Sequence, residues 1–342
     1  MSGFGPGARD LSIMIPTYNC ASLLMETLDA LKRQTLDISQ AQIEVIDDCS
    51  TKDKPEDVVR EAWDGRVDFF RQPKNVTATP NFNTCIERAQ RGWVYILHGD
   101  DFPAVDGLEA LNLAADSVPQ AEVLLARVIM MDAIGVPYWI SDRLGPNLYG
   151  ILEISPSGWR ENPTQFVSTI VKKRAYVEVG PFSDEFVHTA DFWMWWQLAS
   201  TRPTAYTNRI AGYYRSFEGN HSSSLRREAV NIAESIEVLK RIGEALFGSV
   251  EAALAAGHFR GVEDTAYRQA LEFLVRGDRQ AYVTNLNMPS KCGIDVSGRL
   301  HRAENRRKAG RVWQRLWPFS RSDRPLRMPS RTHDAPVEDI RK

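Results

Sequence analysis

The sequence predicts an α/β fold in which a mostly parallel β-sheet is flanked by helices. Three observations support this. Short apolar runs alternate with segments of helical spacing, two of these runs end in acidic pairs, and the alternation continues for about a hundred residues. Such alternation is typical of a parallel sheet with helices on both faces. The 342 residues are enough for one large domain and an accessory part.

Four short apolar runs near the start of the chain are typical of buried strands. Between them, Ser22 is suited to cap a helix, Pro55 fits the first turn of a second, and residues 82–89 have the spacing of a third. The expected strands are residues 11–15, 43–46, 67–70 and 93–97.

The remaining chain is expected to contain two more strands, a long loop and several helices. Residues 135–165 are rich in Gly, Pro, Ser, Trp and Tyr, and long loops of this kind often carry function. The expected strands are residues 121–131 and 206–217, and the expected helices are residues 186–200, 226–247 and 251–283. We therefore predict a domain over residues 1–225, a helical extension over 226–298 and a basic tail over 299–342.

The composition is that of an ordinary globular protein, with 43% hydrophobic and 25% charged residues and a net charge of −2. This charge gives no reason to expect a nucleic-acid partner. No apolar run is long enough to span a membrane, and residues 1–10 lack the pattern of a secretory signal. The four cysteines have neither the density of a disulfide scaffold nor the spacing of a zinc site, so a cytoplasmic location is expected.

Acidic pairs follow two of the expected strands, one formed by Asp47 and Asp48 and the other by Asp100 and Asp101. The carboxyl ends of parallel strands meet at one edge of the sheet, where open α/β folds bind ligands. Carboxylates there can hold Mg²⁺ or Mn²⁺, which neutralises a nucleotide diphosphate and stabilises it as a leaving group. The alternative is that the paired acids only begin a turn or cap a helix.

A nucleoside-binding group is expected where residues 16–19 follow the first strand, with Asp48 beside them. Tyr18 can offer a ring face to a base, and Asp48 can accept a hydrogen bond from the base edge. The alternative is that Tyr18 only lies at a rim and that Asp48 forms a turn with Ser50.

Two further residues are candidates for the chemistry. Asp191 lies among aromatic residues, where burial would raise the pKa of its carboxyl toward that of a useful general base; alternatively, it is only an acid favoured at a helix start. His221 could complete a metal's coordination or bind a diphosphate, and the turn around it could also cap the next helix through Ser222 or Ser223.

The order of these motifs resembles that of the family 2 inverting glycosyltransferases over roughly residues 10–225. The opening pattern of that family, (I/V)P(T/V)YN, is followed by DDxS, a stretch between two asparagines, an acidic metal motif and an ED motif that holds the base. The segments that match these motifs, in order, are residues 15–19, 47–50, 75–83, 98–101 and 190–191.

The resemblance implies a GT-A-type domain, a divalent metal (Mn²⁺ or Mg²⁺) and Asp191 as the catalytic base. By the same resemblance Tyr18 would lie against the nucleotide base, and Asp48 would bind the base or ribose. Asp100 would contact ribose or metal, and Asp101 would bind metal. The implied donor-binding residues are Pro16, Thr17, Tyr18, Asn19, Asp48, Asn83, Asp100 and Arg215, and the implied metal ligands are Asp100, Asp101 and His221.

Three positions depart from the family pattern. His98 stands where many members have the first Asp of a DxD motif, which leaves the metal assignment between Asp100 and Asp101 open. Ala190 replaces the usual Glu before the base, and Gln197 occupies a position that is usually Arg.

The expected activity is transfer of a hexosyl or related group from a nucleotide-diphosphate donor, with UDP favoured, to a hydroxyl-bearing acceptor. The acceptor would be a glycan, a lipid-linked glycan or a protein, as in assembly of cell-envelope polysaccharide, glycolipid or glycoprotein. A sugar nucleotidyltransferase is an alternative, but it predicts a glycine-rich phosphate loop where this chain has residues 16–19. A second alternative is a non-catalytic scaffold that binds a nucleotide sugar.

The tail carries many arginines. In residues 306–319 these arginines alternate with aromatic and apolar side chains. Such a segment could lie on the anionic inner face of a membrane, where a lipid-linked acceptor would be within reach. The alternative is a solvated basic extension.

Overall fold

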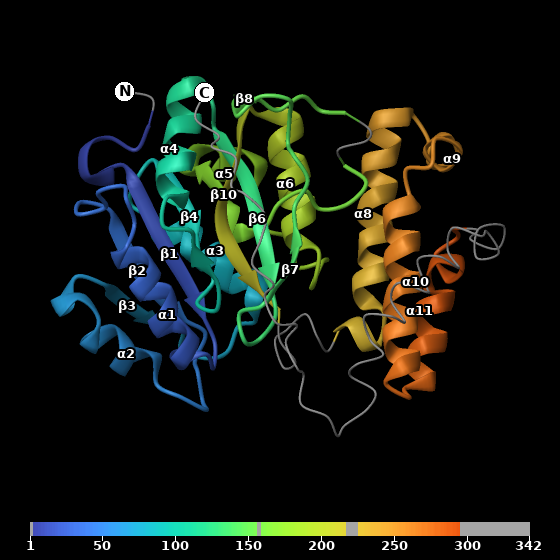
Figure 1. Ribbon diagram of the computed structural model, residues 1–342, viewed down its shortest axis with the longest axis horizontal. Helices are drawn as coiled ribbons and strands as arrows, with labels where there is room; N and C mark the ends of the chain where they lie inside the picture. Colours follow the sequence, from blue (N-terminus) through green and yellow to red (C-terminus); the bar gives the residue numbers. More distant parts are fainter. Residues whose placement is uncertain (1–2, 156–158, 217–224, 295–342) are drawn as a thin grey trace, which may run out of the picture.

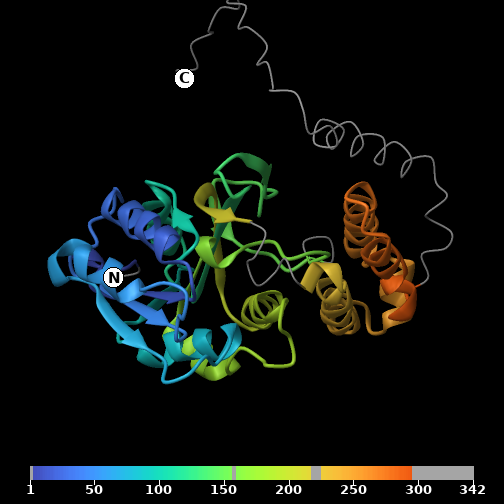
Figure 2. The same ribbon diagram turned by 90° about the horizontal axis from the view of Figure 1, so that it is seen from below.

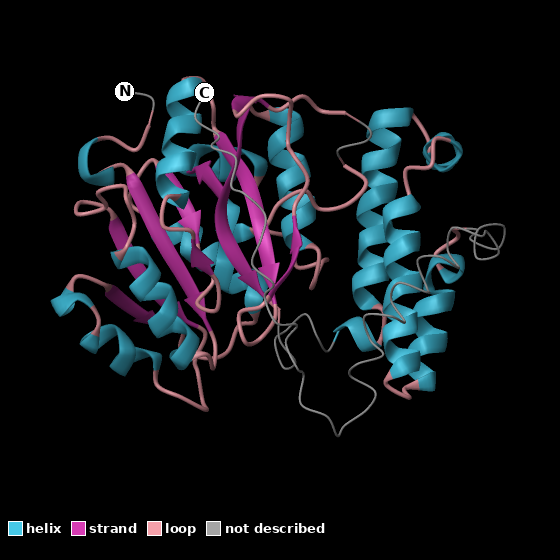
Figure 3. Ribbon diagram, viewed as in Figure 1, coloured by secondary structure: helices cyan, strands magenta, loops and turns pink. Residues whose placement is uncertain are grey.

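The computed structural model describes residues 3–155, 159–216 and 225–294. A single mixed β-sheet carries helices on both faces, and a group of further helices lies beside it (Figure 1). Figure 3 shows the separation between the part that contains the sheet and the purely helical part. The α/β fold expected from the sequence is therefore confirmed.

Four parallel strands form one half of the sheet, in the spatial order β3-β2-β1-β4. The strand β1 lies between β2 and β4 and is buried along its whole length, which explains its apolar sequence. The carboxyl ends of these strands lie at one edge of the sheet, as predicted. The bounds are β1 (Leu11–Thr17), β2 (Gln42–Asp47), β3 (Asp68–Arg71) and β4 (Trp93–Ile96).

The other half of the sheet contains antiparallel pairings. The strand β9 (Thr169–Lys172) joins the halves by pairing antiparallel with β4 and with β6 (Val123–Met131). The strand β10 (Thr204–Arg215) runs parallel to β6, and the short β5 (Phe102–Pro103) pairs antiparallel with β10. This pairing brings the residues that follow β4 next to the end of β10.

The segment 135–165, expected to be a loop, contains two short strands. The strand β7 (Pro137–Ile140) extends the sheet from β6, and β8 (Tyr149–Ile151) pairs with β10. The expectation of a loop throughout was therefore wrong for these residues. Pairing with long neighbouring strands satisfies their backbone groups although their own sequences are short.

The described residues form two apolar cores, one on each face of the sheet. One face is covered by α1 (Ala21–Lys32), α2 (Pro55–Glu61) and α4 (Gly107–Ser117). The other is covered by α3 (Ala78–Arg88), α5 (Lys173–Val179) and α6 (Ala190–Thr201).

The start of α1 differs from the prediction. Ser22 lies inside the first turn, and the N–H of Ala21 donates to Asp53 Oδ2 at 2.8 Å. A carboxylate that folding brings from a distant loop thus takes the place of the expected local cap.

The helical extension is formed by four described helices, which Figure 2 shows as a group beside the sheet. Apolar residues of the first helix, including Ile232 and Ile236, belong to the same core as Trp195 of α6. No described helix is both long and apolar enough to cross a membrane. The bounds are α8 (Val230–Phe247), α9 (Val250–Ala255), α10 (Arg260–Val275) and α11 (Arg279–Lys291).

Candidate active site

The end of β1 is joined by backbone hydrogen bonds to the segments that follow β2 and β4. The Asp48 N–H donates to the Thr17 carbonyl at 2.9 Å, and the Gly99 N–H donates to the Pro16 carbonyl at 3.0 Å. Pro16 and Thr17 therefore hold the two acidic segments at one edge, which is the juxtaposition that the sequence predicted.

Asn19 connects the loops that follow β1 and β2. Its backbone is left-handed, with φ of 52°, and its Oδ1 accepts from the N–H groups of Thr51 and Lys52 at 2.8 and 2.9 Å. The neighbouring Tyr18 leaves 47% of its surface exposed at this edge. Asn19 thus shapes the loop, while the ring of Tyr18 is accessible to a ligand.

The two acids that follow β2 have different surroundings. Asp47 is fully buried; its carboxylate accepts from the Ser50 N–H at 3.1 Å and pairs with Arg71 Nε at 3.3 Å. The turn with Ser50 is therefore made by Asp47 and not by Asp48. Asp48 Oδ1 accepts from the Val76 N–H at 2.7 Å. Burial raises the pKa of Asp48, and hydrogen bonds from the Val76 and Thr77 backbone oppose that rise.

The acids that follow β4 form a cluster with a histidine. Ligand atoms of His98, Asp100 and Asp101 lie within 4.8 Å of one another. Asp101 Oδ1 accepts from the Arg215 N–H at 2.9 Å, whereas the buried Asp101 Oδ2 and His98 Nε2 have no hydrogen-bond partner among the described residues. A buried carboxylate oxygen and a buried imidazole nitrogen that no described residue contacts by a hydrogen bond fit the requirements of a divalent cation.

The pKa values of the cluster agree with a site that could hold a divalent cation. Burial raises the pKa of Asp100 to about 6, and burial followed by the charge of Asp100 raises the pKa of Asp101 well above its usual value. Burial also lowers the pKa of His98 to about 4, which keeps its imidazole neutral near pH 7, the form that binds metals. A bound cation would favour the ionised carboxylates and so offset the cost of burying them.

His98 is held by aromatic packing. Its ring stacks on Phe82 at a centroid distance of 4.9 Å and lies 4.4 Å from the ring of Phe166. Sequence reasoning noted His98 as a departure from the family motif but did not include it among the metal ligands. The predicted third ligand, His221, lies outside the described residues.

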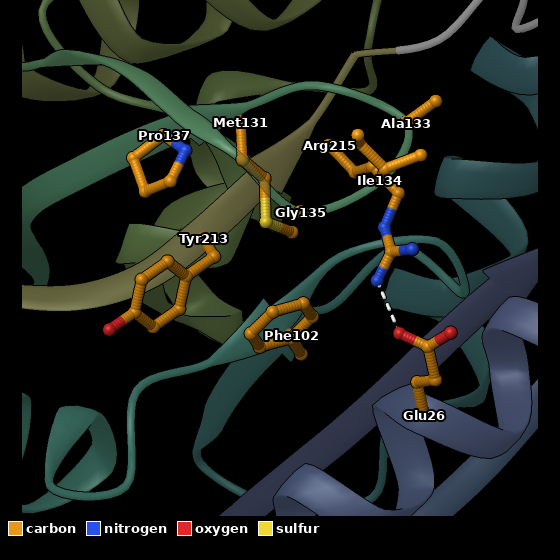
Figure 4. Close-up of a pocket in the computed structure, with 9 residues that line it drawn as sticks. All are labelled: Glu26, Phe102, Met131, Ala133, Ile134, Gly135, Pro137, Tyr213 and Arg215. Carbon is orange, nitrogen blue, oxygen red and sulfur yellow. Dashed lines mark hydrogen bonds and ion pairs between the residues drawn. The ribbon is translucent and has the colours of Figure 1, made fainter. Parts of the chain in front are cut away.

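Arg215 borders both the cluster of His98, Asp100 and Asp101 and a cavity of about 340 Å³ (Figure 4). Its backbone binds Asp101, while its side chain, only 7% exposed, pairs with Glu26 of α1 and lies over the Phe102 ring at 5.6 Å. The guanidinium that was expected to contact the donor thus points toward α1 in this structure. The other residues that line the cavity are Met131, Ala133, Ile134, Gly135, Pro137 and Tyr213.

Asn83 is bound to the backbone of a neighbouring loop. Its Nδ2 donates to the Phe182 carbonyl at 3.1 Å, and its Oδ1 accepts from the Phe182 N–H at 2.8 Å. The structure therefore gives Asn83 a structural contact, and its predicted contact with the donor stays a prediction.

Asp191 lies in the first turn of α6. Its Oδ2 accepts from Asn162 Nδ2 at 2.8 Å, and its Oδ1 accepts from the Phe192 N–H at 2.7 Å. Burial raises the pKa of Asp191 to about 6, although these hydrogen bonds lower it. Such a carboxylate is ionised at neutral pH and basic enough for proton abstraction. Asn162 was not predicted, because it lies in a segment without a recognisable pattern.

Comparisons with known sequences identify related proteins. The family described as Glycosyl transferase family 2 matches residues 12–150. TarS of Staphylococcus aureus, a poly(ribitol-phosphate) β-N-acetylglucosaminyltransferase, is 25% identical over 220 residues, which are 62% of this chain and 37% of TarS. An uncharacterized protein of Sinorhizobium fredii, y4gI, is 27% identical over 192 residues, which are 53% of this chain and 19% of that protein. The chain thus spans well under half the length of these relatives.

Comparisons with solved structures show the fold. S. aureus TarS 1–349 in complex with UDP-GlcNAc has a TM-score of 0.53 and 17% identity, covering 84% of this chain and 93% of the TarS chain. The mannosyltransferase PcManGT from Pyrobaculum calidifontis, in complex with GDP-Man and Mn²⁺, also has a TM-score of 0.53, with 14% identity, covering 91% of this chain and 83% of its own. The fold is of the GT-A type, and residues 12–150 of the chain match glycosyltransferase family 2.

Proposed function

We propose that this chain is an inverting glycosyltransferase that moves a sugar from a nucleotide diphosphate, UDP by preference, to an acceptor hydroxyl. The observation that carries the proposal is the cluster of His98, Asp100 and Asp101 at the sheet edge, where the buried Asp101 Oδ2 and His98 Nε2 have no hydrogen-bond partner in the described part of the chain. The match of residues 12–150 to glycosyltransferase family 2 supports the reaction class, and TarS, which binds UDP-GlcNAc, supports the choice of donor.

The nucleoside end of the donor would lie over the end of β1. The exposed ring of Tyr18 stacks on the base, and Asp48 accepts a hydrogen bond from the base or ribose. Pro16, Thr17 and Asn19 set the shape of this edge through the contacts described above. PcManGT binds GDP-Man, so fold likeness by itself does not select the base.

The diphosphate end would lie at the acidic cluster. Asp100 and Asp101, joined by His98, would hold Mn²⁺ or Mg²⁺, and such a cation supplies Lewis-acid stabilisation of a departing diphosphate. Arg215 fixes the orientation of Asp101 through its backbone N–H. The Mn²⁺ in the PcManGT structure supports a divalent metal in this fold.

Asp191 would act as the general base. It takes the proton from the acceptor hydroxyl while the hydroxyl oxygen bonds to the anomeric carbon and the bond from that carbon to the diphosphate oxygen breaks. Attack opposite the leaving group inverts the anomeric configuration. Asn162 donates a hydrogen bond to Asp191 Oδ2, and this bond holds the carboxylate in a fixed orientation.

The acceptor would be a hydroxyl-bearing glycan, lipid-linked glycan or protein. A contact of residues 306–319 with a membrane would suit a lipid-linked acceptor, and that segment lies outside the described residues.

A panel of nucleotide sugars tests the proposal. We expect a UDP-sugar with Mn²⁺ to raise the melting temperature and to be hydrolysed slowly, and EDTA to remove both effects. Stabilisation without any hydrolysis or transfer would favour a binding scaffold. If no nucleotide sugar stabilises the protein or is consumed, the proposal is wrong.

A further inference from the structure

The helix α8 binds the short segment that leads into α6. Glu234 of α8 accepts hydrogen bonds from three successive backbone N–H groups: Val187 at 3.0 Å, His188 at 2.8 Å and Thr189 at 3.0 Å. The Thr189 hydroxyl adds a fourth bond, at 3.2 Å. A single carboxylate from the helical extension therefore holds the last three residues before α6.

These hydrogen bonds have a clear physical purpose. The three bonded N–H groups belong to the N-cap residue and the two residues before it, where the positive end of the α6 dipole attracts an anion. Thr189, the N-cap residue of α6, makes no capping bond with its own side chain among the described residues. Glu234 supplies the anion from another element, at a point two residues before Asp191.

A second contact, two turns further along α8, acts on the same segment. Arg241 donates to Glu185 Oε2 at 3.0 Å, and its guanidinium lies 5.0 Å from the ring of Phe186 and 5.4 Å from that of Trp193. The segment is thus held at both ends against α8, and the first turn of α6 has little freedom to rotate.

We propose that Glu234 is a positioning residue for Asp191: by fixing residues 187–189 it sets the place of the base carboxylate relative to the acceptor hydroxyl. This inference rests on the proposed function. A catalytic group must be held within about an ångström of its productive place, and such a misplacement costs roughly a hundredfold in rate. The helical extension would therefore act on the reaction through a residue that positions the base and does not itself touch the substrate.

The charge of Glu234 gives this role a signature that simple stabilisation of the fold does not have. Burial is the main cause of the raised pKa of Asp191, and the negative charge of Glu234 adds a smaller contribution in the same direction. Removing the charge should favour the ionised form of Asp191, which lowers its pKa.

Glu234→Gln tests the inference, because the amide keeps the length of the side chain but turns an NH₂ group toward the N–H donors. Glu244→Gln, at an exposed position of the same helix, is the matched control. In Glu234→Gln we expect kcat to fall roughly 10- to 100-fold with donor affinity within about twofold of wild type. The acid limb of the kcat profile should move to lower pH, and Glu234→Asp should recover part of the rate.

Hydrogen exchange at the amides of residues 187–189 provides a readout that does not need activity. Exchange there should accelerate in Glu234→Gln and stay unchanged in Glu244→Gln. Faster exchange with a normal kcat, or a fall in kcat no larger than the loss of folded protein, would overturn the positioning role. If the wild-type protein transfers no sugar yet shows the same exchange difference, the proposed function fails while Glu234 is still shown to fix the segment.

Discussion

The two acidic centres of this molecule are held in place by different means. Asp100 and Asp101 lie in the segment between β4 and β5, and the topology of the sheet brings them beside the ends of β1 and β10. Asp191 depends on side chains from two remote segments, Asn162 and Glu234. The first centre should therefore tolerate changes elsewhere in the chain, whereas the second should be sensitive to substitutions far from it.

The largest expected effect comes from removing the base itself. Asp191→Asn keeps the shape of the side chain but cannot accept the acceptor proton, so transfer should fall about a thousandfold or more. The rate is measured with the UDP-sugar that the panel identifies, and donor affinity should stay within about twofold of wild type. Near-normal turnover would show that another group is the base.

Asp101→Asn should lower transfer by about a hundredfold by weakening the metal site. The amide oxygen can still accept from the Arg215 N–H, so the fold should persist. Titration calorimetry with Mn²⁺ should show weaker binding than in wild type. Unchanged Mn²⁺ affinity would remove Asp101 from the metal site.

Asn162→Ala should have a smaller effect, about tenfold on kcat, and it tests whether the second centre depends on remote residues. The variant loses the 2.8 Å hydrogen bond that favours ionised Asp191, so the pKa of Asp191 should rise. The acid limb of the kcat profile should therefore move to higher pH, opposite to the effect of Glu234→Gln. No change in rate or profile would contradict the role given to Asn162.

The pH dependence of kcat in the wild-type protein can be predicted as well. Because Asp191 is active as a base only when ionised, and its pKa is about 6, kcat should rise as the pH increases through about 6 and then level off. Rates measured at saturating donor and metal between pH 5 and 8 check this, since the ligands then hold the first centre in one state. If kcat of the wild type does not fall below about pH 6 and Asp191→Asn is active, Asp191 is not the general base.

The smallest effect concerns stability at the sheet edge. Asn19→Gly keeps the left-handed backbone but loses the two bonds to Thr51 and Lys52 N–H, so the free energy of unfolding should fall by about 1–2 kcal/mol. Denaturant unfolding measures it. Equal stability of variant and wild type would show that the loop after β1 does not need these bonds.

The sequence was sufficient where local pattern determines structure. The apolar runs of β1 and β4 and the polar residues after them predicted the edge where Asp100 and Asp101 lie. It was insufficient where a role depends on a tertiary contact. Asp53 caps α1 in place of Ser22, and β5 is too short to leave a pattern.

The same limit applies to the surroundings of the site. The contact of Glu234 with the start of α6 spans about 45 positions, and nothing near Glu234 in the sequence indicates it. His98 had a sequence signal, since it stands inside the acidic motif, but it became a candidate ligand only when the structure placed it beside Asp100 and Asp101, with no described hydrogen-bond partner for its Nε2.

The apolar core that α6 and α8 share has a consequence for protein engineering. A protein truncated after residue 225 would lose Ile232 and Ile236 from that core and expose their neighbours on α6, so poor solubility is expected. A chimera with a relative that exchanges only the C-terminal helices would pair mismatched faces. Recombination points that keep α6 and α8 from the same parent should give the better-folded hybrids.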